Sequence, residues 1–185
     1  CIRDRPWGYK WLTGRERRQV FTGNGLLRAA LDFMAEALIL GIPATMEHPA
    51  TPTWRVRCAS TWRLLETKML QQTGQAYTIS LDQCMMGAQA RKPTTLLCVH
   101  LPDAGRKLSD TPNAGRCNHS SHITALGRDA AHGFRTTPLK EYPPLFCQFI
   151  ANLYTSRWDD ILTPQSTSRA IHKELMHFYK TDINA

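Results

Sequence analysis

Glu47 is the acidic residue whose sequence context best fits a chemical role. It follows the short, mostly apolar run 41–46, and His48, Pro49 and Pro52 come after it. Because prolines interrupt regular structure, this pattern predicts a strand that ends at the acid. Side chains at strand ends often carry function in α/β enzymes. Glu47 is therefore predicted to bind the amino or ring-nitrogen edge of a substrate, or alternatively to accept bonds from backbone amides of the following turn.

Two adjacent cations, Arg91 and Lys92, form a second candidate. They follow a glycine turn at Gly87 and lead directly into the strand-like run 94–101. This placement predicts that both reach a phosphate or carboxylate near the sheet edge that carries Glu47. The alternative is an ordinary basic turn.

A third group contains soft metal ligands in the pattern Cys117-x-His119-x-x-His122. Zinc accepts such ligands, but its common structural sites use Cys-x-x-Cys or His-x₃₋₅-His pairs, and neither spacing occurs within this group. Three further residues could complete a site: Cys84, Cys98 and His100. Surface histidines in a polar loop are the alternative, so we predict no bound metal and keep Cys117, His119 and His122 as the candidates.

The charge balance points to anionic partners. The chain has 23 Lys+Arg and 15 Asp+Glu, a formal net charge of +8. This surplus favours nucleic acid or an acidic protein surface, and the alternative is a solvated basic surface. Arg15, Arg17 and Arg18 are predicted to bind nucleic acid, because arginines that alternate with aromatic residues suit phosphate contact and base stacking. Such an arm could equally pack on its own domain. The neighbouring aromatic residues are Trp7, Tyr9 and Trp11.

The apolar spacing predicts elements that would position these residues. Helices are expected at 24–41, 62–74, 143–154 and 168–180, and strands at 41–47, 77–82 and 94–101. The glycine-rich stretch 21–25 is expected to be a helix-entry turn or, alternatively, a nucleotide loop. Alternation of helices and short buried strands predicts the α/β class, with a partial or small Rossmann-like sheet and flanking helices.

Three units are expected along the chain. Residues 1–19 form a basic aromatic arm, 20–155 form an α/β domain with a polar insert at 102–138, and 156–185 carry a C-terminal helix. Six scattered cysteines predict reduced thiols in an intracellular protein, with nucleus and organelle both open. Cys147 falls on an apolar helix face and is expected to be buried and inert. No run of about 18 apolar residues occurs, so no membrane span is predicted.

Taken in order, these segments resemble the second half of the catalytic domain of DNA cytosine-5 methyltransferases. There a helix leads to a strand ending in Glu-Asn-Val, whose glutamate holds the target cytosine, and Met46-Glu47-His48-Pro49 is similar. The family's glycine followed by Pro-Gln-x-Arg-x-Arg resembles Gly87-Ala-Gln-Ala-Arg91-Lys92. Its closing helix, entered through Val-Pro, is similar to 142–153. The resemblance covers 20–155 and implies that Glu47 holds a base, with Arg91 and Lys92 as supporting cations.

The departures from this family concern the chemistry itself. No Pro-Cys nucleophile loop is present, and His48 stands in place of the asparagine. Without a nucleophile the cytosine ring cannot be attacked covalently. Cys1 replaces an initiator Met, which fits a processed chain or a fragment. Methyl transfer from S-adenosylmethionine is therefore expected only if an upstream segment supplies the missing half. Otherwise we expect a non-catalytic domain that binds nucleic acid or a partner, or a basic accessory subunit of a larger assembly.

Overall fold

The computed structural model describes residues 7–9, 11–53, 58–112, 114–123, 128–129, 133–134 and 140–155. The expected helix 168–180, and with it the unit 156–185, lies outside the described residues. The same holds for residues 1–6, the first part of the expected basic arm.

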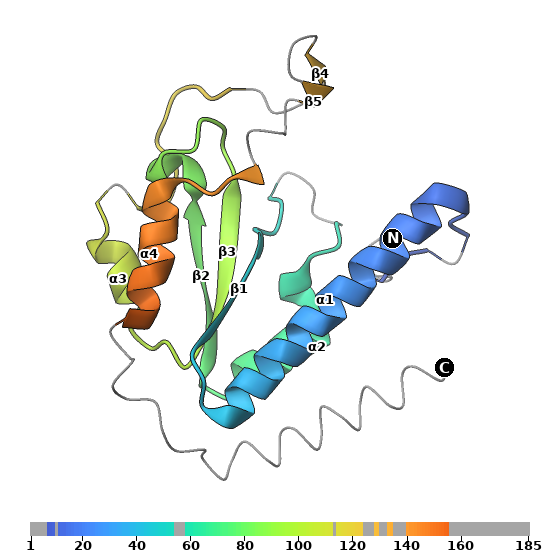
Figure 1. Cartoon of the computed structure of the whole chain (residues 1–185), viewed down its shortest axis with the longest axis horizontal. Coiled ribbons are helices and arrows are strands. Elements are labelled where there is room, and N and C mark those ends of the chain that lie inside the picture. Colours follow the sequence, from blue (N-terminus) through green and yellow to red (C-terminus); the bar gives the residue numbers. More distant parts are fainter. Residues whose placement is uncertain are drawn as a thin grey trace.

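A small antiparallel sheet forms the centre of the domain (Figure 1). Its strands are β1 (Ala44–Pro49), β2 (Ala76–Asp82) and β3 (Pro93–Val99), in the order β1-β3-β2. The run predicted to be most strand-like is thus the central strand, and it is buried from Thr94 to Val99. A separate two-stranded ladder pairs β4 (Arg128–Asp129) with β5 (Gly133–Phe134). The predicted α/β class, with a small sheet and flanking helices, is confirmed.

The strand directions differ from those of a Rossmann sheet, which is mostly parallel. Both β1 and β2 pair antiparallel with β3. The cause is the short connection between β2 and β3, residues 83–92, which contains only the 3₁₀ turn η3 (Gln83–Met86). A parallel pair needs a crossover of about a dozen residues or more, usually a helix, so this connection returns the chain antiparallel.

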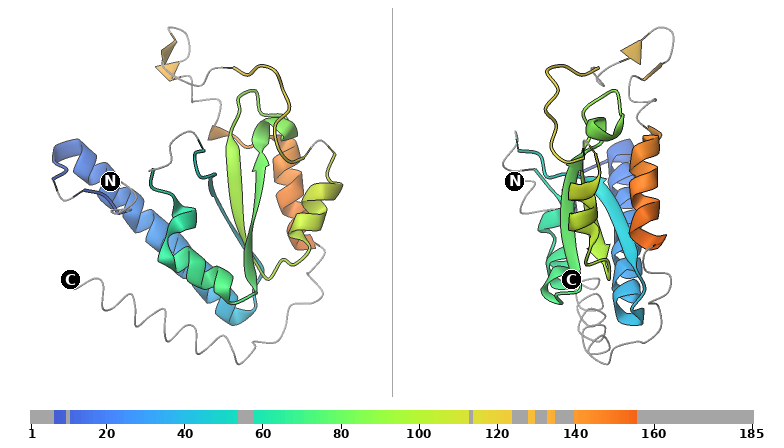
Figure 2. Two further views of the ribbon diagram at one scale, coloured as in Figure 1. Left: turned by 180° about the vertical axis from the view of Figure 1, so that it is seen from behind. Right: turned by 90° about the vertical axis from the view of Figure 1, so that its left-hand side faces the viewer.

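Helices cover both faces of the sheet (Figures 1 and 2). On one side lie α1 (Gly14–Leu40) and α2 (Leu65–Gln72), the latter preceded by the 3₁₀ turn η2 (Thr61–Arg63). On the other lie α3 (Ala104–Asp110) and α4 (Pro144–Thr155). Side chains of a strand alternate between faces. Leu97 and Val99 of β3 accordingly pack with α1 and α2, whereas Leu96 and Cys98 pack with α4.

Helix α1 is longer than predicted. It begins at Gly14 and continues through the glycine-rich stretch 21–25, so that stretch is neither a helix-entry turn nor a nucleotide loop. Each glycine costs a helix about 1 kcal/mol, and the face buried farther along, with Leu31, Met34 and Leu38 below 4% exposed, anchors the helix nonetheless. Gly41 ends it with a φ of 71°. No helix among the described residues is long and apolar enough to cross a membrane.

The described part of the N-terminal arm folds back on α1. The Asn24 amide donates a hydrogen bond to the Trp7 carbonyl at 2.6 Å, and the Arg28 guanidinium lies 4.9 Å from the centre of the Trp7 ring. This agrees with an arm that packs on its own domain. The basic residues 15–18, expected in the irregular arm, belong to α1. Helix α3 lies inside the segment 102–138, expected to be a loop or a small polar insert.

Candidate functional site

Glu47 lies inside β1 rather than at its end. The strand continues through His48 to Pro49, so the predicted stop at the acid is wrong. Proline is tolerated here because β1 is an edge strand with a free side. His48 faces away from Glu47, and its Nε2 lies 3.2 Å from the Thr61 hydroxyl on the α2 side of the sheet. Glu47 thus faces the α4 side without the histidine that follows it.

Side chains from three other segments surround the Glu47 carboxylate. The Tyr142 hydroxyl donates to Oε2 at 3.0 Å. The Gln83 amide and the Thr94 hydroxyl approach Oε1 at 3.5 and 3.4 Å, and Lys92 Nζ lies 3.9 Å from it. The described partners are therefore side chains, in place of the backbone amides considered from sequence. Oε2 accepts one hydrogen bond from a described residue and has the capacity for another.

A pocket of about 390 Å³ opens between β1 and α4, with Glu47 in its wall. This size falls in the range of small-molecule sites. Tyr142 stacks on Phe146 with ring centres 5.1 Å apart, and Lys92 Nζ lies 4.6 Å from the centre of the Tyr142 ring. The pocket thus combines a carboxylate, an aromatic face and apolar side chains. Its lining residues are Thr45, Glu47, Leu96, Tyr142, Phe146, Cys147, Ile150 and Ala151.

Tyr142, which lines the pocket, has a raised pKa. Burial, and then the hydrogen bond and negative charge of Glu47, raise the pKa of Tyr142 to about 12. The phenol is therefore neutral at physiological pH and remains a donor to the carboxylate.

Cys147 is exposed, so the prediction of a buried, inert thiol is wrong. It lies on the side of α4 that lines the pocket, whereas Phe149 and Leu153 face the core.

Arg91 and Lys92 approach different carboxylates. Lys92 lies beside Glu47 as expected, but Arg91 Nε lies 3.5 Å from Asp82 Oδ1. The Asp82 side chain is 0% exposed, and its Oδ2 accepts a hydrogen bond from the Cys117 amide at 2.8 Å. Arg91 therefore neutralises a buried carboxylate that holds a neighbouring loop. The Arg91 side chain is still 56% exposed, and its contact with nucleic acid stays a prediction.

The basic group Arg15, Arg17 and Arg18 is exposed on the first turns of α1. Helix α1 packs in the core cluster that contains Leu97 and Val99, whereas α4 packs in the cluster that contains Leu96 and Cys98. The structure therefore does not bring these arginines to the pocket. Their contact with nucleic acid also stays a prediction.

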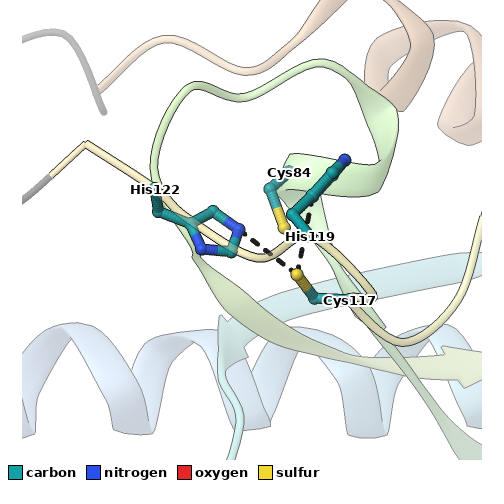
Figure 3. A group of neighbouring side chains, drawn as sticks. All are labelled: Cys84, Cys117, His119 and His122. Carbon is teal, nitrogen blue, oxygen red and sulfur yellow. Dashed lines mark hydrogen bonds between the residues drawn. The ribbon is translucent and has the colours of Figure 1, made fainter.

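Four metal-ligand side chains converge at the β2 end of the molecule (Figure 3). Cys84 comes from η3, and Cys117, His119 and His122 come from the loop that follows α3. Cys84 is one of the three further partners considered from sequence, along with Cys98 and His100. The sequence signal for choosing Cys84 is its position directly after β2. Asp82, the last residue of β2, binds the loop that carries Cys117 through both its side chain and its backbone amide.

The other two suggested partners lie elsewhere. Cys98 is fully buried in β3 between Thr45 and Tyr77 of the flanking strands, and burial raises its pKa to about 12. His100 Nε2 contacts the Leu38 carbonyl at 2.9 Å. Cys98 and His100 lie at the Val99 end of β3, about 17 Å along the strand from Pro93. The η3 turn precedes β3 at its Pro93 end. Neither can join a site at η3.

Comparisons of the chain with protein-family models, with curated proteins and with solved structures find no match. The case for function therefore comes from the residues and their geometry.

Proposed function

We propose that this domain binds single-stranded nucleic acid and holds one amino-bearing base in the pocket between β1 and α4. The observation that carries the proposal is the Glu47 carboxylate, which lies in the pocket wall beside the aromatic ring of Tyr142. A carboxylate accepts hydrogen bonds from the exocyclic amino group of cytosine. Aromatic side chains add stacking energy for any base. The resemblance to the base-holding half of cytosine-5 methyltransferases supports the same assignment.

The charge of the pocket suits this ligand. Lys92 lies 3.9 Å from Glu47 and also faces the Tyr142 ring, so it partly compensates the carboxylate. The chain as a whole carries +8, which attracts a phosphate backbone independently of sequence. Glu47 would then provide base preference, while the exposed arginines provide general affinity.

The proposed activity is binding without methyl transfer. Stretch 21–25 is helical and packs within α1, so it does not form a glycine loop for S-adenosylmethionine. We therefore derive no catalytic step through this cofactor. Methyl transfer belongs to the proposal only where a further segment supplies both the cofactor loop and the nucleophile.

The test compares two labelled oligonucleotides, oligo-dC and oligo-dT, by fluorescence anisotropy at fixed salt. Thymine offers a carbonyl where cytosine offers an amino group, so Glu47 should favour oligo-dC by about 10-fold, equivalent to the 1–3 kcal/mol of a good base contact. Glu47→Gln should remove the preference for oligo-dC. The glutamine amide can accept a hydrogen bond from the cytosine amino group through its oxygen or donate one to the thymine carbonyl through its nitrogen. The matched control is Glu141→Gln, an exposed neighbour outside the pocket lining. Equal binding of both oligonucleotides by the unaltered protein would refute the proposal.

A second candidate function is that of an accessory subunit that docks through the start of α1. The observation in its favour is Phe21, which is 80% exposed beside Arg17 and Arg18 in a shallow groove. An exposed aromatic ring next to cations suits an acidic protein surface. Reversal of Arg15, Arg17 and Arg18 to glutamate should then abolish binding of a labelled polyglutamate peptide, while Glu47→Gln leaves it unchanged. The opposite pattern would exclude this function.

A further inference from the structure

The Cys84, Cys117, His119 and His122 side chains form a compact donor set. Cys117 Sγ lies 3.5 Å from His119 Nδ1 and 3.2 Å from His122 Nε2, and all four donor atoms lie within 4.8 Å of one another. In a tetrahedral zinc site, with Zn–S bonds of about 2.3 Å and Zn–N bonds of about 2.0–2.1 Å, neighbouring donors lie about 3.3–3.8 Å apart. The cluster needs only small side-chain movements to reach that arrangement.

The backbone around the four residues is fixed independently of their side chains. Gly87 adopts a φ of 103° and closes the η3 turn through its amide, which donates to the Cys84 carbonyl. Asp82 then ties the second segment to the end of β2, since its amide donates to the Gly115 carbonyl and its carboxylate accepts from the Cys117 amide. A site whose ligands are held in place before binding costs little conformational entropy to fill.

The burial of the cluster is graded. Cys84 is buried, Cys117 and His122 are half-buried, and His119 is exposed. Burial and the neighbouring Cys117 thiol raise the pKa of Cys84. One side of the cluster therefore rests on the fold and the other is open to solvent, which provides an entry path for an ion.

Three of the four donors come from one loop. Residues 114–123 form no helix or strand. Binding residues often lie on irregular segments that a rigid scaffold positions. A disulfide between Cys84 and Cys117 would restrain the loop but would not account for two histidines whose ring nitrogens lie against the Cys117 sulfur.

We propose that Cys84, Cys117, His119 and His122 bind one zinc ion, which fastens the loop 114–123 to the η3 turn. Two thiolates and two imidazoles in tetrahedral reach are a ligand set that selects zinc. Four protein ligands fill the coordination sphere, so the ion is structural. The zinc site is separate from the Glu47 pocket, but η3 contributes to both. Gln83 of η3 contacts Glu47, and the adjacent Cys84 belongs to the metal-ligand cluster.

The test uses the full chain, purified under reducing conditions without added metal. Elemental analysis should find one equivalent of zinc. After its removal by chelation, titration with Co²⁺ should produce the intense visible bands of tetrahedral cobalt and a sulfur-to-cobalt charge-transfer band. Cys117→Ser and His122→Asn should each weaken Co²⁺ binding by at least about 100-fold, because loss of an outer partner alone costs about 10–100-fold. The matched controls are Cys147→Ser and His48→Asn, which should bind as the unaltered protein does.

Three results would overturn the proposal. They are a Co²⁺ spectrum of octahedral type in the unaltered protein, unchanged affinity in Cys117→Ser, and a Cys84–Cys117 disulfide in the reduced preparation. Where the ligand variants fail to fold, X-ray absorption at the zinc edge of the unaltered protein decides instead. Two sulfur and two nitrogen neighbours support the site, and any other set contradicts it.

Discussion

The Tyr142 hydroxyl donates a 3.0 Å hydrogen bond to the Glu47 carboxylate across 95 residues of sequence. This contact joins the edge strand β1 to the segment that enters α4, and so defines the mouth of the pocket. It also keeps a neutral donor beside a carboxylate whose other oxygen faces Gln83, Thr94 and Lys92.

Replacement of Tyr142 by phenylalanine should separate this hydrogen bond from the aromatic ring. We expect Tyr142→Phe to lower the free energy of unfolding by about 1 kcal/mol, the net value of such a bond. Binding of oligo-dC should weaken modestly, because the stacking surface remains. Urea denaturation measures the first effect and anisotropy the second. Tyr9→Phe is the control, since Tyr9 stacks on Trp11 away from the pocket. An equal loss in both variants would contradict a specific role for the bond.

The raised pKa of Tyr142 predicts how the domain responds to alkaline pH. Its folded pKa of about 12 exceeds the usual tyrosine pKa of 10.0. The protonated phenol is thus favoured by folding, and its contribution to stability is complete below about pH 10 and is lost as the pH rises toward 12. Ultraviolet titration should show a late tyrosine ionisation that Tyr142→Phe removes, beside those of Tyr77 and Tyr154, whose pKa values are also raised by burial. Glu47→Gln should shift this ionisation to lower pH, because the carboxylate contributes to the shift after burial. An unshifted titration would remove Glu47 from the explanation.

Asp82 should support both the fold and the loop that carries Cys117. Its buried carboxylate accepts from the Cys117 amide and contacts Arg91. Asp82→Ala removes the fully buried acceptor of the half-buried Cys117 amide, so we expect a loss of about 2 kcal/mol in the free energy of unfolding, within the range for a hydrogen bond to a charged group. Thermal and urea unfolding measure it. Asp103→Ala, which removes an exposed pair with Arg106, should cost at most about 1 kcal/mol. A smaller effect at Asp82 than at Asp103 would show that the loop does not depend on this carboxylate.

Cys147 provides a chemical probe of the pocket. It is exposed and lines the pocket with Glu47, whereas Cys98 is buried with a pKa of about 12. Iodoacetamide should therefore modify Cys147 rapidly and Cys98 only after unfolding. Saturating oligo-dC should slow the modification of Cys147 several-fold, while half-buried Cys58, outside the pocket lining, reacts at an unchanged rate. Mass spectrometry of the tryptic peptides follows each site. Unprotected Cys147 in the saturated complex would place the bound base elsewhere.

Much of the fold could be predicted from local pattern. The apolar run 94–101 became the central strand, which ends two residues earlier than expected, at Val99. The segments 77–82 and 143–154 became β2 and α4, each within one residue at both ends. These segments bury a continuous or periodic apolar face, which local sequence displays directly. Helix α1 was underestimated because its first turns are exposed and lack that periodicity, and its buried part farther along the chain holds them in register.

The sequence by itself determined the chemical types present: a carboxylate in an apolar run, two adjacent cations, and a Cys-His-His group in a polar loop. Tertiary structure decided which of them meet. The short β2–β3 connection forces antiparallel pairing, which places Thr94 and Gln83 beside Glu47 and brings α4 over the same face. The same turn brings Cys84 to Cys117, His119 and His122, 33 positions or more along the chain. Such contacts depend on chain reversal and side-chain alternation between faces, and local spacing in the sequence encodes neither.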